Sequence, residues 1–156
     1  MDSYRIVPAE QAHVAPFMKH MRPDDYIELS RAERFPVAET ISHAITDSTL
    51  ARTLLIDGEP AAIWGFVRWG IMTGSGSPWL VTGRQLEKRR RLLLIGGRIF
   101  LDEIKQHCPH LVVMVDREHH RALRWLKWLG FELQGPFPHG PYGKKFVRAE
   151  MRPKEV

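Results

Sequence analysis

The residues best suited to proton transfer fall in two separate parts of the sequence. An acidic N-terminal region contains Asp25, Glu28 and Glu33, whose carboxylates are candidate general bases. Two adjacent imidazoles, His119 and His120, are candidates much further along the sequence. Each of these groups also has a simpler role, as a helix cap or a surface charge. Their spacing alone therefore does not select one of them.

Basic side chains are concentrated in residues 84–91, RQLEKRRR, where five of them accompany one acidic residue. Together with a formal net charge of +5, this favours an acidic partner such as a nucleotide cofactor, a nucleic acid or an acidic protein surface. The run lacks interleaved aromatic residues for base stacking, so a nucleic-acid partner is disfavoured. A solvated, solubilising surface is the alternative interpretation.

Cysteine content and hydropathy exclude several classes of protein. Cys108 is the only cysteine, so no internal disulfide can form. His107 and His110 flank it, but Pro109 interrupts the group and no fourth ligand is suitably spaced, so we expect no metal site. The sequence has neither an apolar stretch of about 18 residues nor a signal peptide. We therefore expect a cytoplasmic protein without a membrane partner.

Hydrophobic periodicity and turn residues predict alternating strands and helices in one domain that spans residues 1–156. The predicted strands cover residues 4–7, 51–56, 61–69, 78–83, 111–115, 131–134 and 146–151. The predicted helices cover residues 9–21, a segment capped by Asp24 or Asp25 and ended by Pro36, and residues 37–46, 88–106 and 121–129. Turns are expected at Asp57-Gly58, at residues 73–78 and at residues 135–143. Trp64 and Trp69 are expected to fill the core.

The segment RALRWLKWLGF, residues 121–131, combines a helix, a glycine stop and a strand. Its apolar residues Ala122, Leu126 and Leu129 share one stripe, with Arg121 turned outward. Gly130 can end the helix in a left-handed conformation. The adjoining strand, residues 111–115, reads as buried.

With Ala122 eight residues before Gly130-Phe131, this segment resembles the signature helix of the GNAT acetyltransferase superfamily, Asn-x-x-Ala-x-x-x-Tyr-x-x-x-Gly-Phe. His119 and Leu126 stand where that family has Asn and Tyr. The resemblance implies an α/β domain with a mixed sheet of about six or seven strands and about four or five helices. It also implies that the strand at residues 78–83 splays from its parallel neighbour at 111–115.

The same resemblance implies that acetyl-CoA or CoA is bound in the splay. Its pantetheine arm would pair with the backbone of the strand, and arginine side chains would replace the missing glycine-rich phosphate loop. It assigns to the cofactor Leu80, Val81, Thr82, Lys88, Arg89, Arg90, His119 and Trp125. Among the candidate bases we select Glu28 as the catalytic base, and Tyr142, with Tyr26 as the alternative, as the acid that would replace the family tyrosine.

A narrower resemblance covers residues 78–133 and the turn around Gly58. These segments are similar to a small group of GNAT-like tailed-phage proteins that are labelled internal virion or assembly proteins. It implies a phage protein of the bacterial host cytoplasm or the virion, whose partners are acyl-CoA and a host protein or virion component. A homodimer is left open. Two functions follow: acyl transfer to an amine of a small molecule or host protein, or a catalytically degenerate scaffold for virion assembly or host-protein binding.

Overall fold

The structure, a computed structural model, describes residues 3–70, 72 and 74–153. Within them, seven strands form one sheet in the order β1-β2-β3-β4-β5-β7-β6. The strands are β1 (Tyr4–Pro8), β2 (Leu50–Ile56), β3 (Glu59–Gly70), β4 (Ser75–Thr82), β5 (His110–Asp116), β6 (Glu132–His139) and β7 (Lys144–Met151). The helices are α1 (Val14–Met18), α2 (Pro23–Ala32), α3 (Val37–Asp47), α4 (Arg90–His107) and α5 (His120–Leu129). Short 3-10 turns lie at Gln11–His13 (η1) and Arg84–Leu86 (η2). The predicted mixed α/β architecture is confirmed.

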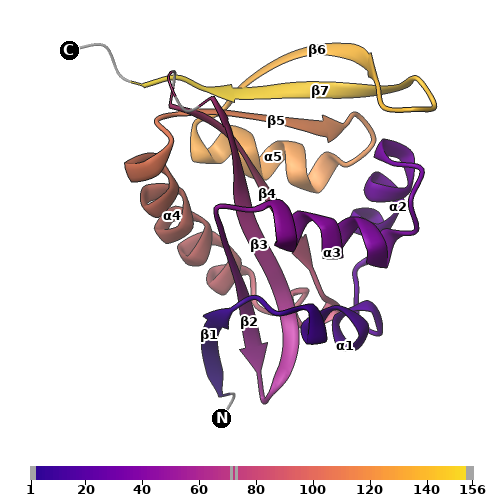
Figure 1. The fold of residues 1–156 in the computed structure, drawn as a ribbon, viewed down its shortest axis with the longest axis vertical. Coiled ribbons are helices and arrows are strands. Elements are labelled where there is room, and N and C mark those ends of the chain that lie inside the picture. The colour runs from indigo at the N-terminus through magenta and orange to yellow at the C-terminus, as the bar shows by residue number, and fades with distance from the viewer. Residues whose placement is uncertain (1–2, 71, 73, 154–156) are drawn as a thin grey trace.

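The sheet consists of two antiparallel groups joined by one parallel contact. Strands β1 to β4 pair antiparallel in sequence order, and so do β5 with β7 and β7 with β6. Strands β4 and β5 are parallel. Figure 1 shows β5, β6 and β7 running across the top of the molecule, whereas β2, β3 and β4 run lengthwise. The sheet therefore changes direction where β4 meets β5.

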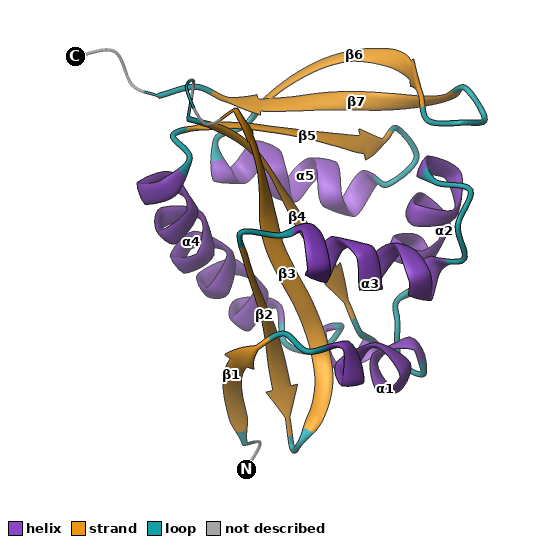
Figure 2. Cartoon of the chain, viewed as in Figure 1, coloured by secondary structure: helices purple, strands orange, loops and turns teal. Residues whose placement is uncertain are grey.

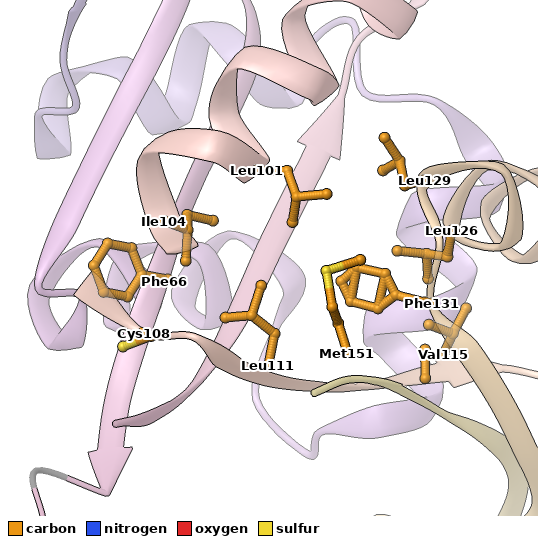
Figure 3. Packing of buried hydrophobic residues seen from close by; sticks show 11 residues of the cluster. Phe66, Leu101, Ile104, Cys108, Leu111, Val115, Leu126, Leu129, Phe131 and Met151 are labelled. Carbon is orange, nitrogen blue, oxygen red and sulfur yellow. The ribbon is translucent and has the colours of Figure 1, made fainter. Parts of the chain in front are cut away.

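Helices cover both faces of this sheet (Figure 2). On one face α4 and α5 pack against the strands, with Leu101, Ile104 and Leu126 in a cluster that also includes Leu111 of β5. Figure 3 shows these apolar side chains converging between the two helices and the sheet. On the other face, residues of α1 and α3 pack against β3 and β4. The cavity described below lies between the two helix layers.

Local sequence signals account for the elements around α5. Gly130 has φ +107°, a left-handed conformation that glycine adopts without a Cβ penalty. Its N–H closes the last turn of α5, and Phe131 follows directly into the buried core. The hairpin at Asp57-Gly58 is also present, with both residues at positive φ. These two turns confirm the predictions made from them.

The predicted helix at residues 9–21 is wrong in its extent. It ends at Met18, because Lys19 and His20 form a turn and the chain then pairs beside β4. His20 accepts a hydrogen bond from the N–H of Arg84, and Arg22 donates to the C=O of Thr82 at 2.9 Å. Met21 thereby forms an antiparallel bridge with Gly83. Pairing with a distant part of the backbone prevails over local helical periodicity here.

Two predicted turns also differ. Strand β4 starts at Ser75, inside the turn expected at residues 73–78, of which residue 73 lies outside the described residues. Strand β6 continues to His139 through the Pro/Gly-rich connection expected at residues 135–143. Its register shifts between Gln134 and Phe137, which accommodates Gly135 and Pro136 as an irregularity in the ladder.

Two side-chain predictions are wrong as well. Trp69 is 56% exposed rather than in the core, while Trp64 is half-buried. Neither Asp24 nor Asp25 caps α2: Arg22 is the N-cap and Pro23 starts the helix. No helix among the described residues is long and apolar enough to cross a bilayer.

Candidate functional site

Strands β4 and β5 separate soon after they meet. Among the described residues their register pairs only Ser75 with His110 and Gly76 with Leu111, although β4 continues to Thr82. A cavity of about 400 Å³, here called the splay cavity, lies in the widening gap. Its walls come from α2 and α3 on one face of the sheet and from α4 and α5 on the other. The splay expected from the sequence is therefore present.

Backbone groups of β4 alternate between the β3 edge and the edge that faces the gap. Gly83 donates its N–H to a carbonyl of β3 at 2.7 Å, so it faces β3. By alternation Val81 also faces β3. The backbone groups of Thr82, Leu80 and Pro78 consequently point into the gap.

Only part of that edge is left open. Thr82 donates its N–H to Asp25 at 2.8 Å, and its C=O accepts from Arg22. Pro78 has no N–H to offer. Leu80 is thus the gap-facing residue that presents both a donor and an acceptor to the splay cavity. Leu80, Val81 and Thr82 were assigned to backbone contacts with the cofactor. Of these three, Leu80 is the one whose N–H and C=O both face the gap and stay open.

Glu28 of α2 lines the same cavity as Leu80. Its carboxylate accepts a hydrogen bond from the backbone N–H of Asp116 at 3.0 Å. Burial raises the pKa of Glu28 to about 7, against the opposing effects of the His119 charge and of this hydrogen bond. Asp116 is itself buried and pairs with Arg31 at 2.5 Å. A carboxyl group that titrates near neutral pH can exchange a proton under working conditions.

A buried ionic cluster joins α2 to β4 and α5. Asp25 Oδ1 lies 2.7 Å from His119 Nε2 and 3.2 Å from an Arg121 guanidinium nitrogen. Asp24 binds the same guanidinium at 2.8 and 3.0 Å. Burial alone would raise the pKa of Asp24, but its hydrogen bond and charge interaction with Arg121 lower it. The cluster fixes the first turn of α2 across the end of β4.

His119 has a second role as the N-cap of α5. Its Nδ1 accepts the N–H of Ala122 at 3.3 Å, so in the neutral ring Nε2 carries the proton that Asp25 accepts. Burial alone would lower the pKa of His119, but the Asp25 hydrogen bond and the charges of Glu28, Asp25 and Asp24 raise it. Both ring nitrogens are therefore used within the protein, although the ring also borders the splay cavity.

The same cluster has the composition of a cation site. Ligand atoms of Asp24, Asp25 and His119 lie within 4.8 Å of one another. The Arg121 guanidinium is already bound to both carboxylates and supplies the positive charge that they require. His110, which lies near Cys108 in the sequence, instead bonds Glu150 at 2.6 Å and Ser75 at 2.8 Å.

The basic segment before α4 contains two kinds of residue. The half-buried Arg89 donates to the carbonyl oxygen of Gln85 and so braces the turn that precedes the helix. Lys88 and Arg90 are exposed, and Arg90 is the first residue of α4. Positive side chains beside a helix N-terminus are a suitable environment for phosphate.

The remaining two assigned residues are placed very differently. Trp125 of α5 lines the splay cavity. Tyr142 is 55% exposed in the turn between β6 and β7 and is not part of the cavity wall. The splay cavity therefore brings together six of the assigned residues, Glu28, Leu80, Val81, Thr82, His119 and Trp125. Lys88, Arg89, Arg90 and Tyr142 lie outside its wall.

Sequence reasoning missed the roles of Asp25 and Arg121. Arg121 is half-buried in the ionic cluster instead of facing outward. The available signal was the acidic pair at residues 24–25 near a helix start, which local reasoning assigns to capping. Their partners on α5 lie more than 90 residues away in the sequence, and Thr82, which bonds Asp25, lies 57 residues away.

No protein-family model matches this sequence, and no curated protein does either. Solved structures match over nearly the whole chain. An N-acetyltransferase from Staphylococcus aureus Mu50 has a TM-score of 0.70 at 13% identity, covering 97% of this chain and 99% of that one. The ribosomal-protein-S18-alanine N-acetyltransferase from Escherichia coli has 0.64 at 16%, covering 99% and 96%. A ribosomal L7/L12 alpha-N-protein acetyltransferase, solved with coenzyme A, has 0.69 at 10%, covering 96% and 93%. The chain therefore has the GNAT acetyltransferase fold.

Proposed function

We propose that the protein is an acyl-CoA-dependent N-acyltransferase that modifies an amine of a small molecule or a protein. The supporting observation is that one cavity contains both the open backbone of Leu80 and a Glu28 carboxyl with a pKa of about 7. An open strand edge binds an extended amide chain as an added strand, which suits a pantetheine arm. The similar acetyltransferase that was solved with coenzyme A adds support through the shared fold.

Each step can be assigned to groups of this protein. Acyl-CoA would supply a thioester, whose carbonyl carbon is attacked by the amine as the C–N bond forms and the C–S bond breaks. Leu80 would hold the pantetheine amide, and Lys88 and Arg90 would bind the phosphates. Glu28 would take the ammonium proton, which frees the nitrogen lone pair for attack. Water would protonate the departing thiolate, because Leu126 is apolar and Tyr142 lies outside the cavity.

Binding and turnover test this function separately. Calorimetric titration with CoA should show binding, and substituting both Lys88 and Arg90 by Glu should weaken it. Release of free thiol from acetyl-CoA, followed with candidate amines such as spermidine and N-terminal peptides, should show turnover. The absence of any CoA affinity in the wild-type protein would overturn the proposal.

The role of Glu28 has a matched control on the same helix. Glu28→Gln should retain CoA binding but reduce kcat/KM by about 100-fold or more, which is the usual contribution of a positioned general base. For the wild type, kcat/KM should rise with pH through about 7, as Glu28 loses its proton. Glu33→Gln changes an exposed carboxylate at the end of α2 and should leave both CoA binding and kcat/KM unchanged. Equal effects of the two substitutions would exclude Glu28 as the base.

A second function is a binding scaffold that has lost acyl transfer, as in a phage virion-assembly or host-factor-binding protein. The observation that favours it is the loss of backbone donors along β4, where Pro78 has no N–H and the N–H of Thr82 is bound to Asp25. Salt-sensitive association with an acidic protein, without CoA affinity, would favour this function over catalysis.

A further inference from the structure

A second cavity, of about 480 Å³, lies between α4 and the sheet and is called here the α4 cavity. Leu54, Ala62 and Trp64 line it from the strands, and Leu92 and Ile99 line it from α4. Its charged lining residues, Arg52 and Glu103, bind each other through two hydrogen bonds of 2.9 and 3.2 Å. Because these charges are satisfied within the protein, the cavity suits an apolar ligand that brings no polar group of its own.

The α4 cavity adjoins the splay cavity. The residues that line both are Leu80, Leu93, Gly97, Phe100 and Trp125. The indole of Trp125 lies directly against Gly97, where an added Cβ would come within 2.5 Å of the ring. Its Nε1 is buried without a hydrogen-bond partner among the described residues, so no such bond fixes the orientation of the ring. Trp125 therefore forms a partition between the two cavities.

The far end of the α4 cavity is open and apolar. Ile6 of β1 and Ile99 of α4 lie at this end and are 60% and 65% exposed. Gly96 also lines the cavity, and a Cβ added there would meet no atom within 4 Å. A flexible hydrocarbon tail that entered at Leu80 would thus meet apolar walls along its length and an open end.

We propose that the α4 cavity holds the hydrocarbon tail of a medium-length acyl donor, so that the preferred substrate is an acyl-CoA longer than acetyl-CoA. This rests on the proposed acyl transfer and specifies its donor. Leu80 belongs to both cavities, so an acyl-CoA whose pantetheine amide is held at the Leu80 backbone can direct its acyl tail past Trp125 into the α4 cavity. The reaction is unchanged: the acyl carbon gains the amine nitrogen and loses the thiol sulfur.

Calorimetry with CoA, acetyl-CoA and octanoyl-CoA tests the acyl length. Each fully buried methylene contributes about fourfold in affinity, and octanoyl has six more than acetyl. We expect octanoyl-CoA to bind at least about 100-fold more tightly than acetyl-CoA. Similar affinities for the two would overturn this inference while leaving the proposed function intact. No binding of any of the three would instead refute the proposed function.

Two further measurements locate the acyl tail. Gly96→Leu places a side chain in open space at the wall of the α4 cavity. It should reduce the ratio of octanoyl-CoA affinity to acetyl-CoA affinity by at least about tenfold. The control Gly96→Ala should change this ratio much less. Titration with 8-bromooctanoate, which needs no CoA site, should quench tryptophan fluorescence, and the double substitution Trp64→Phe and Trp125→Phe should remove much of that quenching. An unchanged ratio in Gly96→Leu, or quenching that is unaffected by the double substitution, would place the acyl tail elsewhere and refute the inference.

Discussion

Substitution of Asp25 by alanine should destabilise the fold by about 3–5 kcal/mol, the usual effect of removing one partner of a buried charged pair. The Asp25 side chain is 10% exposed, and its carboxylate accepts the N–H of Thr82 at 2.8 Å. It also bonds His119 at 2.7 Å and Arg121 at 3.2 Å. Alanine would leave these groups without that acceptor, and each unsatisfied buried group costs about 1–3 kcal/mol. Arg121 would still bind Asp24, so the total loss of stability should be smaller than the sum of the costs for Thr82, His119 and Arg121.

Urea unfolding, followed by circular dichroism, measures this effect. With a denaturant slope of about 2 kcal/mol per M, the midpoint should fall by about 2 M. Asp24→Ala is the matched control, because its side chain is 43% exposed and bonds Arg121 and the N–H of Asp25, but neither β4 nor Thr82. That variant should lose about 1 kcal/mol or less. Equal losses in the two variants would refute the conclusion that Asp25 joins α2 to β4 and α5.

Substitutions at four other positions test separate features. Hydrogen bonds from His110 and Arg148 lower the pKa of Glu150 to about 2. The ionised carboxylate therefore adds up to about 3 kcal/mol to the free energy of unfolding. This stabilisation should be complete above pH 4.5 and should disappear as the pH falls toward 2. The difference in unfolding free energy between wild type and Glu150→Gln should follow that course. Gly130→Ala should lower the free energy of unfolding by about 1–2 kcal/mol, because alanine is strained at φ +107°. Gly96→Ala should raise it by about 0.5–1 kcal/mol, because Gly96 lies on the exposed side of α4, away from the helix ends, where a Cβ meets no other atom. Glu28→Gln should stabilise by up to about 3 kcal/mol at pH 8 but not at pH 4, because the raised pKa of Glu28 penalises its charged form in the folded state.

The elements of this fold could be predicted where the signal is local. Asp57-Gly58 and Gly130 specify their own backbone conformations, and the apolar run of β5 requires burial on both faces. The order of strands and helices followed from such segments. The extent of α1 and the start of β4 could not be predicted, because Met21 and Gly83 pair across more than 60 residues. Local periodicity contains no information about that pairing.

The candidate site was predictable in part, for the same reason. Leu80 and Glu28 were identified as site residues, and they share one cavity. The hydrogen bond from the Thr82 N–H to Asp25, which makes this donor unavailable to a cofactor, could not be predicted, because each residue alone fits a simpler local role. Tyr142 was selected for its phenol, but sequence spacing did not indicate where the β6–β7 turn would place it.

Asp25 and Glu28 occupy the same face of α2, three residues apart, and this spacing connects the stability of the fold with the proton chemistry of the cavity. Asp25 holds that face against β4 and α5, and burial of Glu28 against the same surface is the main cause of its raised pKa. If the Asp25 contacts are lost, α2 can move outward and water can reach the Glu28 carboxyl. Its pKa should then fall toward the usual value of 4.5. Asp25 thus accepts the Thr82 N–H of β4, and by holding α2 in place through this bond it keeps the pKa of Glu28, the proposed base, near 7.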